Sequence, residues 1–99
     1  MQIEYGDETL RRLAEDPDFA PRQWSRDVIR AYRKKIQLLG AAKDERDLRQ
    51  LRGLRLKELS GKRAGTSSIR LNDQYRLVLR FRTDPEGRVV IVLELVDYH

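Results

Sequence analysis

The fold is decided by the stretch Ser67-Ser-Ile-Arg-Leu-Asn-Asp-Gln-Tyr-Arg-Leu-Val-Leu-Arg-Phe81, followed after a turn by Arg88-Val-Val-Ile-Val-Leu-Glu-Leu-Val-Asp-Tyr-His99. From Tyr75 onward, apolar side chains alternate with basic ones at the period of a β-strand. The connecting run Asp84-Pro85-Glu86-Gly87 carries the proline and glycine that are typical of a tight turn. We therefore predict three successive strands that form a β-meander. The last strand is apolar at nearly every position, as expected of a central strand.

The residues before this stretch favour one strand and two helices. Residues 1–5 alternate as a short strand does, and Asp7 is placed to cap a helix that ends near Asp16, before a proline. A longer helix is predicted from Pro21 to about Leu39, ended by Gly40, with the apolar stripe Trp24, Val28, Tyr32, Ile36 and Leu39.

Residues 44–51 have the pattern of a short capped helix or turn, with Leu48 and Leu51 on one side. A glycine-punctuated basic loop over residues 60–66 then leads into the meander. The predicted order is β-α-α-β-β-β, an α+β two-layer fold with a mostly antiparallel sheet. The helices should pack on one face and leave the other partly open, and residues 1–99 should form a single domain.

The composition narrows the classes of function. Lys and Arg number 21 against 16 Asp and Glu, which gives a net charge of +5 and favours a polyanionic partner, with a merely solvated basic surface as the alternative. The absence of cysteine excludes disulfides and thiolate chemistry, and a single histidine argues against a catalytic metal centre. No cofactor is expected. No apolar run or signal peptide is present, so we expect a cytoplasmic protein that does not enter the membrane.

The long helix is itself strongly basic. Because its apolar stripe is well formed, we interpret its basic side chains as the solvated face of a core-packing helix rather than as a nucleic-acid reader. These side chains are Arg22, Arg26, Arg30, Arg33, Lys34 and Lys35.

Candidate functional residues converge on one end of the predicted sheet. Three arginines occupy the strand phase opposite the core, basic side chains of the preceding segment lie beside them, and the last strand ends in a carboxylate, a phenol and an imidazole. These residues are Arg70, Arg76 and Arg80, then Lys57, Lys62 and Arg63, and finally Asp97, Tyr98 and His99. Such a set suits a phosphodiester, since guanidinium groups bind phosphate and stabilise the charge of its transition state.

RNA is the preferred substrate, because its own 2′-hydroxyl is the nucleophile and a site without metal need only move protons. DNA, which lacks that hydroxyl, would be rejected. The alternative to a catalytic role is that His99 is only an exposed terminal residue. The alternative to phosphate binding is that the arginines only form a solvated face of the sheet.

The run Ser68-Ile-Arg-Leu-Asn-Asp-Gln-Tyr-Arg76, preceded by Leu59-Ser-Gly-Lys-Arg63 and closed by Val96-Asp-Tyr-His99, resembles the HigB branch of the RelE/ParE toxin superfamily. The resemblance implies the toxin of a type II toxin–antitoxin pair, also called a plasmid maintenance killer protein. Such a toxin is a ribosome-dependent mRNA interferase that enters the decoding site. It is neutralised by a HigA-like helix-turn-helix antitoxin, and it meets operator DNA only through that complex.

By the same resemblance, Arg76 contacts phosphate and residues 97–99 carry the catalysis, with His99 as acid and Asp97 as base or orienter. Lys57 stands where some members have histidine, and Ser60-Gly61-Lys62 replaces a common Lys-Gly-Asp run, so Lys57 or Lys62 takes the cationic role. Two other functions stay open: a ParE-like inhibitor of DNA gyrase without cleavage chemistry, and an inactive RNA-binding module.

Overall fold

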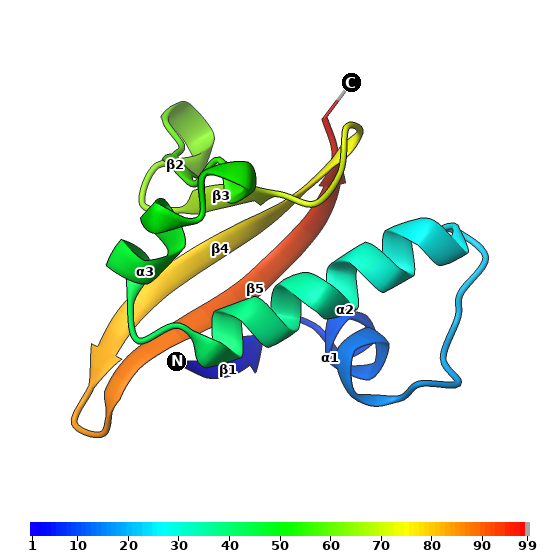
Figure 1. Cartoon of the computed structure of the whole chain (residues 1–99), viewed down its shortest axis with the longest axis horizontal. Helices are drawn as coiled ribbons and strands as arrows, with labels where there is room; N and C mark the ends of the chain where they lie inside the picture. The colour runs from blue at the N-terminus through cyan, green and yellow to red at the C-terminus, as the bar shows by residue number, and fades with distance from the viewer. Residues whose placement is uncertain (99) are drawn as a thin grey trace.

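The computed structural model describes residues 1–98, and the two layers of the fold are visible in Figure 1. Its elements follow in the order β1 (Gln2–Tyr5), α1 (Glu8–Glu15), α2 (Arg26–Ala41), α3 (Glu45–Gln50), the 3₁₀ turn η1 (Arg52–Leu54), β2 (Lys57–Glu58), the 3₁₀ turn η2 (Gly61–Arg63), β3 (Ser67–Arg70), β4 (Tyr75–Asp84) and β5 (Gly87–Asp97). None of the helices within residues 1–98 combines the length and the apolarity that crossing a membrane requires.

The strands described form one sheet in the order β1-β5-β4-β3-β2. The predicted meander is confirmed as β3, β4 and β5, which pair antiparallel, with β5 in the interior of the sheet. Two features go beyond the prediction. The first strand pairs parallel with β5, and β2 adds an edge strand next to β3 where an irregular segment was expected. The fold class is confirmed as α+β.

The β4–β5 hairpin is the longest pairing of the sheet. Pro85 and Glu86 connect the strands, and Gly87 begins β5 with φ at +130°, a conformation that side chains with a Cβ rarely adopt. The pairing shifts register between Val78 and Leu79, so one strand carries an extra residue. Such bulges increase the local twist of a strand and re-aim the side chains beyond them.

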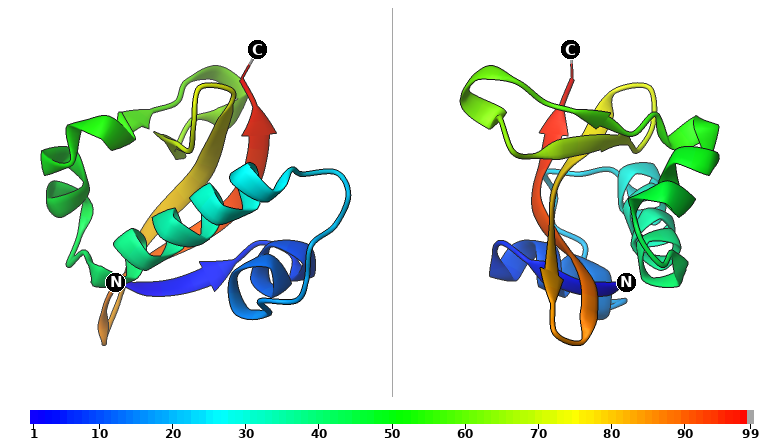
Figure 2. Two further views of the ribbon diagram at one scale, coloured as in Figure 1. Left: turned by 45° about the vertical axis from the view of Figure 1, so that its right-hand side comes forward. Right: turned by 90° about the vertical axis from the view of Figure 1, so that its left-hand side faces the viewer.

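The core lies between the sheet and the helices. Side chains of β4 and β5, among them Leu77, Leu79 and Val92, pack with Ile29 and Tyr32 of α2 and are buried. The Tyr32 hydroxyl donates to the carbonyl of Leu10 at 2.7 Å, which ties α2 to α1. The right-hand view of Figure 2 shows α2 and α3 on the same side of the sheet, which we call the helix face. The other side is the open face.

The predicted bounds of the long helix were wrong at both ends. Ser25 caps α2, its hydroxyl accepting the amide of Val28 at 3.2 Å, so Trp24 precedes the helix and lies outside the predicted stripe. At the other end α2 continues through Gly40, which does not take the left-handed φ of a glycine cap. The helix stops instead where the Ala42 amide donates to the Leu38 carbonyl.

The pairing of Leu48 with Leu51 was also wrong. Leu48 is fully buried, but Leu51 is 44% exposed. The reason is that α3 ends at Gln50 and the chain turns into η1, which takes Leu51 out of the helical phase. By contrast Asp7 caps α1 as predicted, its carboxylate accepting the Leu10 amide at 2.8 Å.

Candidate functional site

A hollow of about 230 Å³ lies on the open face where β5 ends. It is lined by residues of β3, β4, β5 and η2 and by one residue that follows β2 and one that follows β5: Leu59, Arg63, Ser68, Arg76, Val78, Val96, Asp97 and Tyr98. Four of the predicted site residues are among them, namely Arg63, Arg76, Asp97 and Tyr98. A fifth, Lys57, contacts Tyr98. The topology explains this meeting, because β3 lies between β2 and β4 and β4 lies between β3 and β5.

Arg76 forms the floor of the hollow and is only 8% exposed, so it is not the solvated cation that strand alternation alone suggested. Its Nε donates to the Ser68 hydroxyl at 2.9 Å, and its Nη2 donates to the carbonyls of Arg55 at 2.7 Å and Ser68 at 3.4 Å. Arg55 has φ at +49° and thereby turns its carbonyl to the guanidinium. Within residues 1–98, Nη1 has no hydrogen-bond partner and remains for a ligand.

Tyr98 covers this guanidinium. The centre of its ring lies 5.3 Å from Arg76 Cζ and 5.3 Å from Lys57 Nζ, distances at which a cation is attracted to an aromatic face. Lys57 Nζ also donates to the Tyr98 hydroxyl at 2.9 Å. Tyr98 is nevertheless 57% exposed, so an incoming molecule can reach the phenol. The two cations and the phenol therefore form one cluster, which we call the Arg76–Tyr98–Lys57 cluster.

The Asn-Asp-Gln run between β3 and β4 holds the end of β5 in place. Asn72 Oδ1 accepts the amides of Gln74 and Tyr75 at 2.9 and 2.8 Å and closes the turn. Gln74 then accepts the Tyr98 amide on its carbonyl at 2.7 Å, and its side chain donates to Asp97 at 2.9 Å. Asp97 is thus oriented at the rim of the hollow by the motif that precedes β4.

Ionisation within the cluster follows from these contacts. The hydrogen bond from Lys57, followed by the charge of Lys57 and that of Arg76, lowers the pKa of Tyr98 below its ordinary value. Burial lowers the pKa of Arg76, although a guanidinium starts so high that it stays charged. The site therefore combines a fixed cation with a phenol that gives up its proton more easily than a tyrosine in water.

The four predicted RNA-binding residues are not equally placed. Arg63 lines the hollow but is ion-paired with Glu94, and Arg70 is ion-paired with Asp73. Lys62 is exposed on η2 without an ion-pair partner within residues 1–98. Arg80 is exposed on β4 four residues beyond Arg76, a distance of about 13 Å along a strand. The structure therefore does not bring Arg80 to the site.

Comparison with known proteins identifies the family. Residues 3–99 match the family model described as HigB-like toxin, RelE-like toxin of type II toxin-antitoxin system HigB. The chain belongs to this family. It is 37% identical to Toxin HigB-1 of Vibrio cholerae serotype O1 over 81 residues, which covers 82% of this chain and 84% of that protein.

A solved structure shares the fold of this HigB-like toxin, and a second one is matched more weakly. The YoeB/ParE toxin from Agrobacterium tumefaciens matches with a TM-score of 0.58 at 14% identity over the whole of both chains. The toxin–antitoxin complex RelBE2 from Mycobacterium tuberculosis matches with a TM-score of 0.48 at 22% identity, over 97% of this chain and 95% of that chain.

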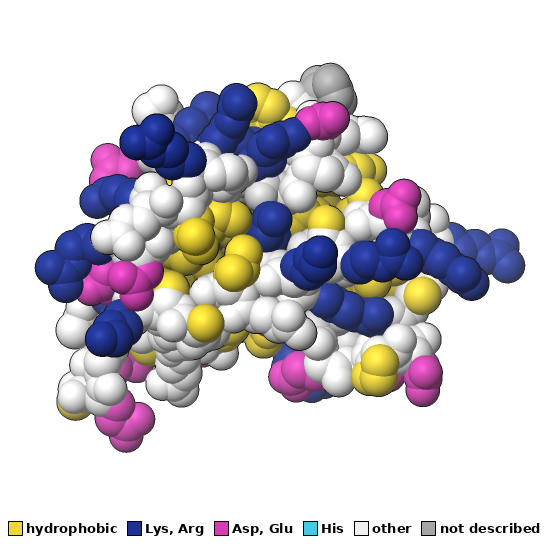
Figure 3. All heavy atoms as spheres, in the orientation of Figure 1, with side chains coloured by type: hydrophobic (Ala, Val, Ile, Leu, Met, Phe, Trp, Pro, Cys, Tyr) yellow, Lys and Arg dark blue, Asp and Glu magenta, His cyan; other side chains and the backbone are white. Residues whose placement is uncertain are grey.

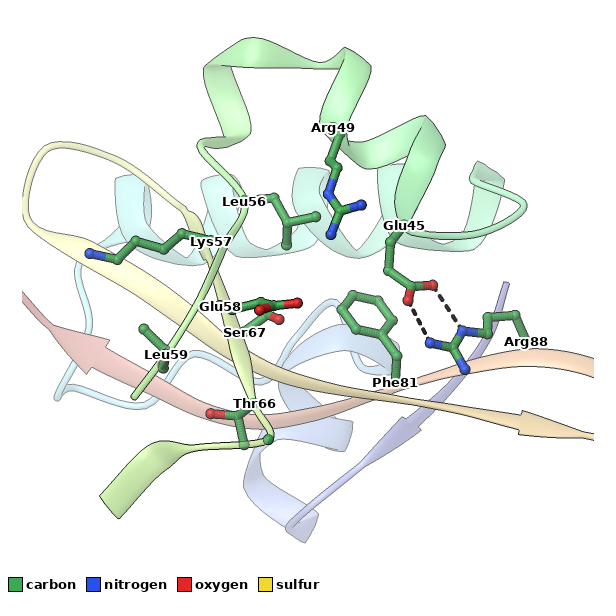
Figure 4. Close-up of a pocket in the computed structure, with 11 residues that line it drawn as sticks. Glu45, Arg49, Leu56, Lys57, Glu58, Leu59, Thr66, Ser67, Phe81 and Arg88 are labelled. Atoms are coloured by element: carbon green, nitrogen blue, oxygen red, sulfur yellow. Dashed lines mark hydrogen bonds and ion pairs between the residues drawn. The ribbon is translucent and has the colours of Figure 1, made fainter. Parts of the chain in front are cut away.

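A second hollow of this toxin lies on the helix face, between α3 and the sheet (Figure 4), and has a volume of about 340 Å³. Leu56 and Phe81 give it apolar walls, and two of its charged side chains are paired with each other, since Glu45 accepts from Arg88 Nε at 2.8 Å. Lys57 borders this hollow, but Figure 4 shows its side chain extending away from Phe81 and Arg88. We therefore assign Lys57 to the open-face cluster.

Sequence reasoning missed the residues that hold Arg76 and Lys57 in place. Ser68 and the Arg55 carbonyl bind Arg76, and the short strand β2 positions Lys57 opposite Ser68. The sequence did contain a signal for this strand, because Leu54 and Leu56 alternate with Arg55 and Lys57 up to the start of β2. His99 lies outside the described residues, and within residues 1–98 no group of three or more acidic side chains or histidines could hold a metal ion.

Proposed function

We propose that this toxin is an endoribonuclease that cleaves mRNA on the translating ribosome without a metal ion. The observation that carries the proposal is the Arg76–Tyr98–Lys57 cluster. The buried guanidinium of Arg76 keeps one nitrogen, Nη1, without a hydrogen-bond partner within residues 1–98. It lies under the exposed phenol of Tyr98, which accepts a hydrogen bond from the ammonium group of Lys57. Preorganised positive charge next to a proton donor is what in-line cleavage of a phosphodiester requires.

In the proposed reaction the 2′-oxygen of the ribose attacks the adjacent phosphorus and the bond from phosphorus to the 5′-oxygen breaks. The products are a 2′,3′-cyclic phosphate and a free 5′-hydroxyl. One group must accept the proton of the 2′-hydroxyl and another must protonate the leaving 5′-oxygen. Arg76 Nη1 binds a non-bridging phosphate oxygen, where it stabilises the charge that develops in the transition state.

Tyr98 and Asp97 are the proton-transfer groups that the described residues offer, and His99 remains a proposed acid on the sequence argument alone. Tyr98 is suited to protonate the 5′-oxygen, because its pKa is lowered and Lys57 stabilises the phenolate that results. Asp97, held by Gln74 at the rim, is suited to accept the 2′-proton or to orient the base.

The partners follow from this function. A toxin of this family has an antitoxin partner, and we propose that it is a HigA-like helix-turn-helix protein through which alone the toxin meets operator DNA. The ribosomal decoding site and its message would be the target, which requires a cytoplasmic toxin. Of the predicted RNA-binding residues, Lys62 and Arg80 are exposed and have no ion-pair partner within residues 1–98, and they would contact RNA outside the scissile linkage.

The test is single-turnover cleavage of a message on purified programmed ribosomes. We expect Tyr98→Phe and Lys57→Gln to lower the cleavage rate about 100-fold or more, because each removes a proton-transfer or charge-stabilising group. Lys43→Gln, which removes an equally exposed ammonium group far from the hollow, is the charge-matched control. Folding is checked by circular dichroism.

Cleavage by both site variants at the rate of Lys43→Gln would remove the cluster from the mechanism. Inhibition of gyrase supercoiling with intact messages would favour the ParE-like alternative. Binding of ribosomes without any cleavage by the unmodified toxin would favour the inactive RNA-binding module.

A further inference from the structure

The hollow between α3 and the sheet takes no part in the proposed cleavage, because the Arg76–Tyr98–Lys57 cluster opens on the other face. We call it the α3 hollow. Its volume of about 340 Å³ is in the range of small-molecule sites and is enough for one planar heterocycle. Figure 4 shows four side chains that point into this space from α3, from β2 and the residue before it, and from β4: Arg49, Leu56, Glu58 and Phe81.

The ring of Phe81 gives the α3 hollow an aromatic platform. It is partly exposed, and the centre of the ring lies 5.8 Å from Cζ of Arg88. Glu45 in turn accepts from Arg88 Nε at 2.8 Å, so the ring has a fixed neighbour on the side of the β4–β5 hairpin. Leu56 supplies a second apolar surface. A planar aromatic ligand can stack on such a platform.

Two charged side chains of the α3 hollow are unpaired. Arg49 of α3 and Glu58 of β2 are exposed, and within residues 1–98 neither makes an ion pair or a side-chain hydrogen bond. The guanidinium offers a fork of donors, and the carboxylate offers a pair of acceptors, both toward the same hollow. A ligand that meets both must therefore present acceptors to Arg49 and donors to Glu58.

Guanine is the nucleobase that carries both patterns on one ring system. Its N1–H and N2–H groups are adjacent donors that match a carboxylate, and its O6 and N7 atoms are adjacent acceptors that match a guanidinium. Adenine and cytosine present an amine next to a ring acceptor instead, and uracil presents a ring N–H between two carbonyls. Guanine is thus the base that satisfies Arg49 and Glu58 together.

The surface beyond the α3 hollow suits the phosphate of a nucleotide. An adjoining hollow of about 500 Å³ shares Glu45, Arg49 and Arg88 with it and is also lined by Lys43. Lys43 is exposed, and its ammonium group has no ion-pair partner in the described part of the chain. Figure 3 shows basic and acidic side chains side by side over α3, so a cation lies within this mixed surface rather than in a purely basic one.

We propose that the α3 hollow binds a guanine base, either of a free mononucleotide or of an unstacked residue in single-stranded RNA. The base stacks on Phe81, donates to Glu58 and accepts from Arg49. Lys43 contacts the 5′-phosphate. This binding does not depend on the proposed cleavage, although β2 contributes to both sites, with Lys57 in the cluster and Glu58 in the hollow.

The experiment titrates isotope-labelled full-length toxin with guanosine 5′-monophosphate (GMP) or uridine 5′-monophosphate (UMP) and follows the backbone amides by NMR. We expect GMP to bind about tenfold more tightly than UMP, because UMP lacks both matched edges. The amides of Glu58 and Phe81 should shift more than those of Arg76 and Val96, which line the hollow of the open face. Inosine monophosphate lacks the N2 amine and 7-deaza-GMP lacks the N7 acceptor, so each should bind about fivefold more weakly than GMP.

Two variants assign these contacts. Glu58→Gln should abolish the preference for GMP over inosine monophosphate and keep the preference over 7-deaza-GMP, whereas Arg49→Gln should do the reverse. Glu86→Gln and Arg52→Gln are the matched controls, because they neutralise exposed side chains outside the α3 hollow. Since Arg49 and Glu58 have no side-chain bonds to lose within residues 1–98, their variants should keep the fold, which circular dichroism verifies.

Equal affinities for GMP and UMP would overturn the proposal, as would amide shifts centred on the open face or equal losses in the site and control variants. A 2′-O-methyl oligonucleotide with one guanosine among uridines identifies the source of the base, because it has no free 2′-hydroxyl and cannot be cleaved by 2′-oxygen attack. If it binds at least as tightly as GMP and loses that affinity when uridine replaces the guanosine, the base comes from an RNA strand. Weaker binding than GMP assigns the site to a mononucleotide.

Discussion

The environment of Arg76 in the structure differs from the one that the sequence pattern predicts. Strand alternation put it among exposed cations, but three hydrogen bonds to Ser68 and Arg55 and the ring of Tyr98 enclose it. A buried guanidinium with fixed donors loses little entropy when it binds phosphate, which favours a site residue over a solvated one.

We predict that Arg76→Ala lowers the free energy of unfolding by about 2 kcal/mol, because it removes charge-assisted hydrogen bonds and leaves buried acceptors unpaired. Arg80→Ala, on the same strand but exposed, should change it by less than about 0.5 kcal/mol. Urea denaturation followed by circular dichroism measures both. Equal stabilities of the two variants would contradict the enclosed geometry of Arg76.

A second prediction at this scale concerns tyrosine ionisation. Contact with Lys57 lowers the pKa of Tyr98, whereas burial raises the pKa values of Tyr5 and Tyr32, so Tyr98 should ionise before those two as the pH rises. Tyrosinate absorbance near pH 10 reports this. Tyr98→Phe should remove a component that titrates below those of Tyr5 and Tyr32, and Lys57→Gln should move this component upward, since the phenolate loses its ammonium partner. A component that stays unchanged in both variants would refute the contact.

At the scale of elements, the meander could be predicted and the edge of the sheet could not. The signal is clear because these strands pair with sequence neighbours: β4 alternates with a period of two, and β5 is apolar at nearly every position. The strand β2 comprises only two residues, too few for a periodic signal, and its pairing with β3 spans a loop. The site depends on β2 because it carries Lys57.

The hairpin that joins β4 to β5 gives a prediction at this scale. Gly87 has φ at +130°, so Gly87→Ala should lower the free energy of unfolding by about 1 to 2 kcal/mol although a Cβ would meet open space. Gly53→Ala is the control, because its position is equally open and its φ is not positive. Thermal unfolding of both variants measures the difference. A Gly87→Ala protein as stable as Gly53→Ala would show that the turn accommodates a side chain without strain.

At the scale of the whole molecule, the net positive charge and the proposed cleavage site lie in different parts of the chain. The net charge of +5 resides in residues 22–41, whereas around the hollow Arg63 and Arg70 are neutralised by Glu94 and Asp73. The basic helix was interpreted from the sequence as a solvated face. The structure agrees that Arg26, Arg30 and Lys34 are exposed, and within residues 1–98 no ion pair of Arg26 or Lys34 is found.

Substitutions on α2 and substitutions at the proposed cleavage site should therefore produce different kinetic defects. In ribosome-dependent cleavage, a variant with Arg26→Gln, Arg30→Gln and Lys34→Gln should require about tenfold more ribosomes for half-maximal rate with little change in the maximal rate, because it loses electrostatic binding that is the same in the ground state and the transition state. Tyr98→Phe should lower the maximal rate instead. Rates measured over a series of ribosome concentrations separate the two effects, and a reduced maximal rate in the triple variant alone would contradict this prediction.

The amino-acid sequence by itself determined the meander, its inward and outward phases, the cap of α1 and the resemblance to HigB-like toxins, because these depend on local periodicity and contiguous motifs. Only the tertiary structure decided that Arg76 is enclosed, that Lys57 contacts Tyr98, and which cations are neutralised. Lys57 and Tyr98 are 41 residues apart, and Arg63 and Glu94 are 31 apart. Contacts over such separations depend on strand order and register, which periodicity does not encode.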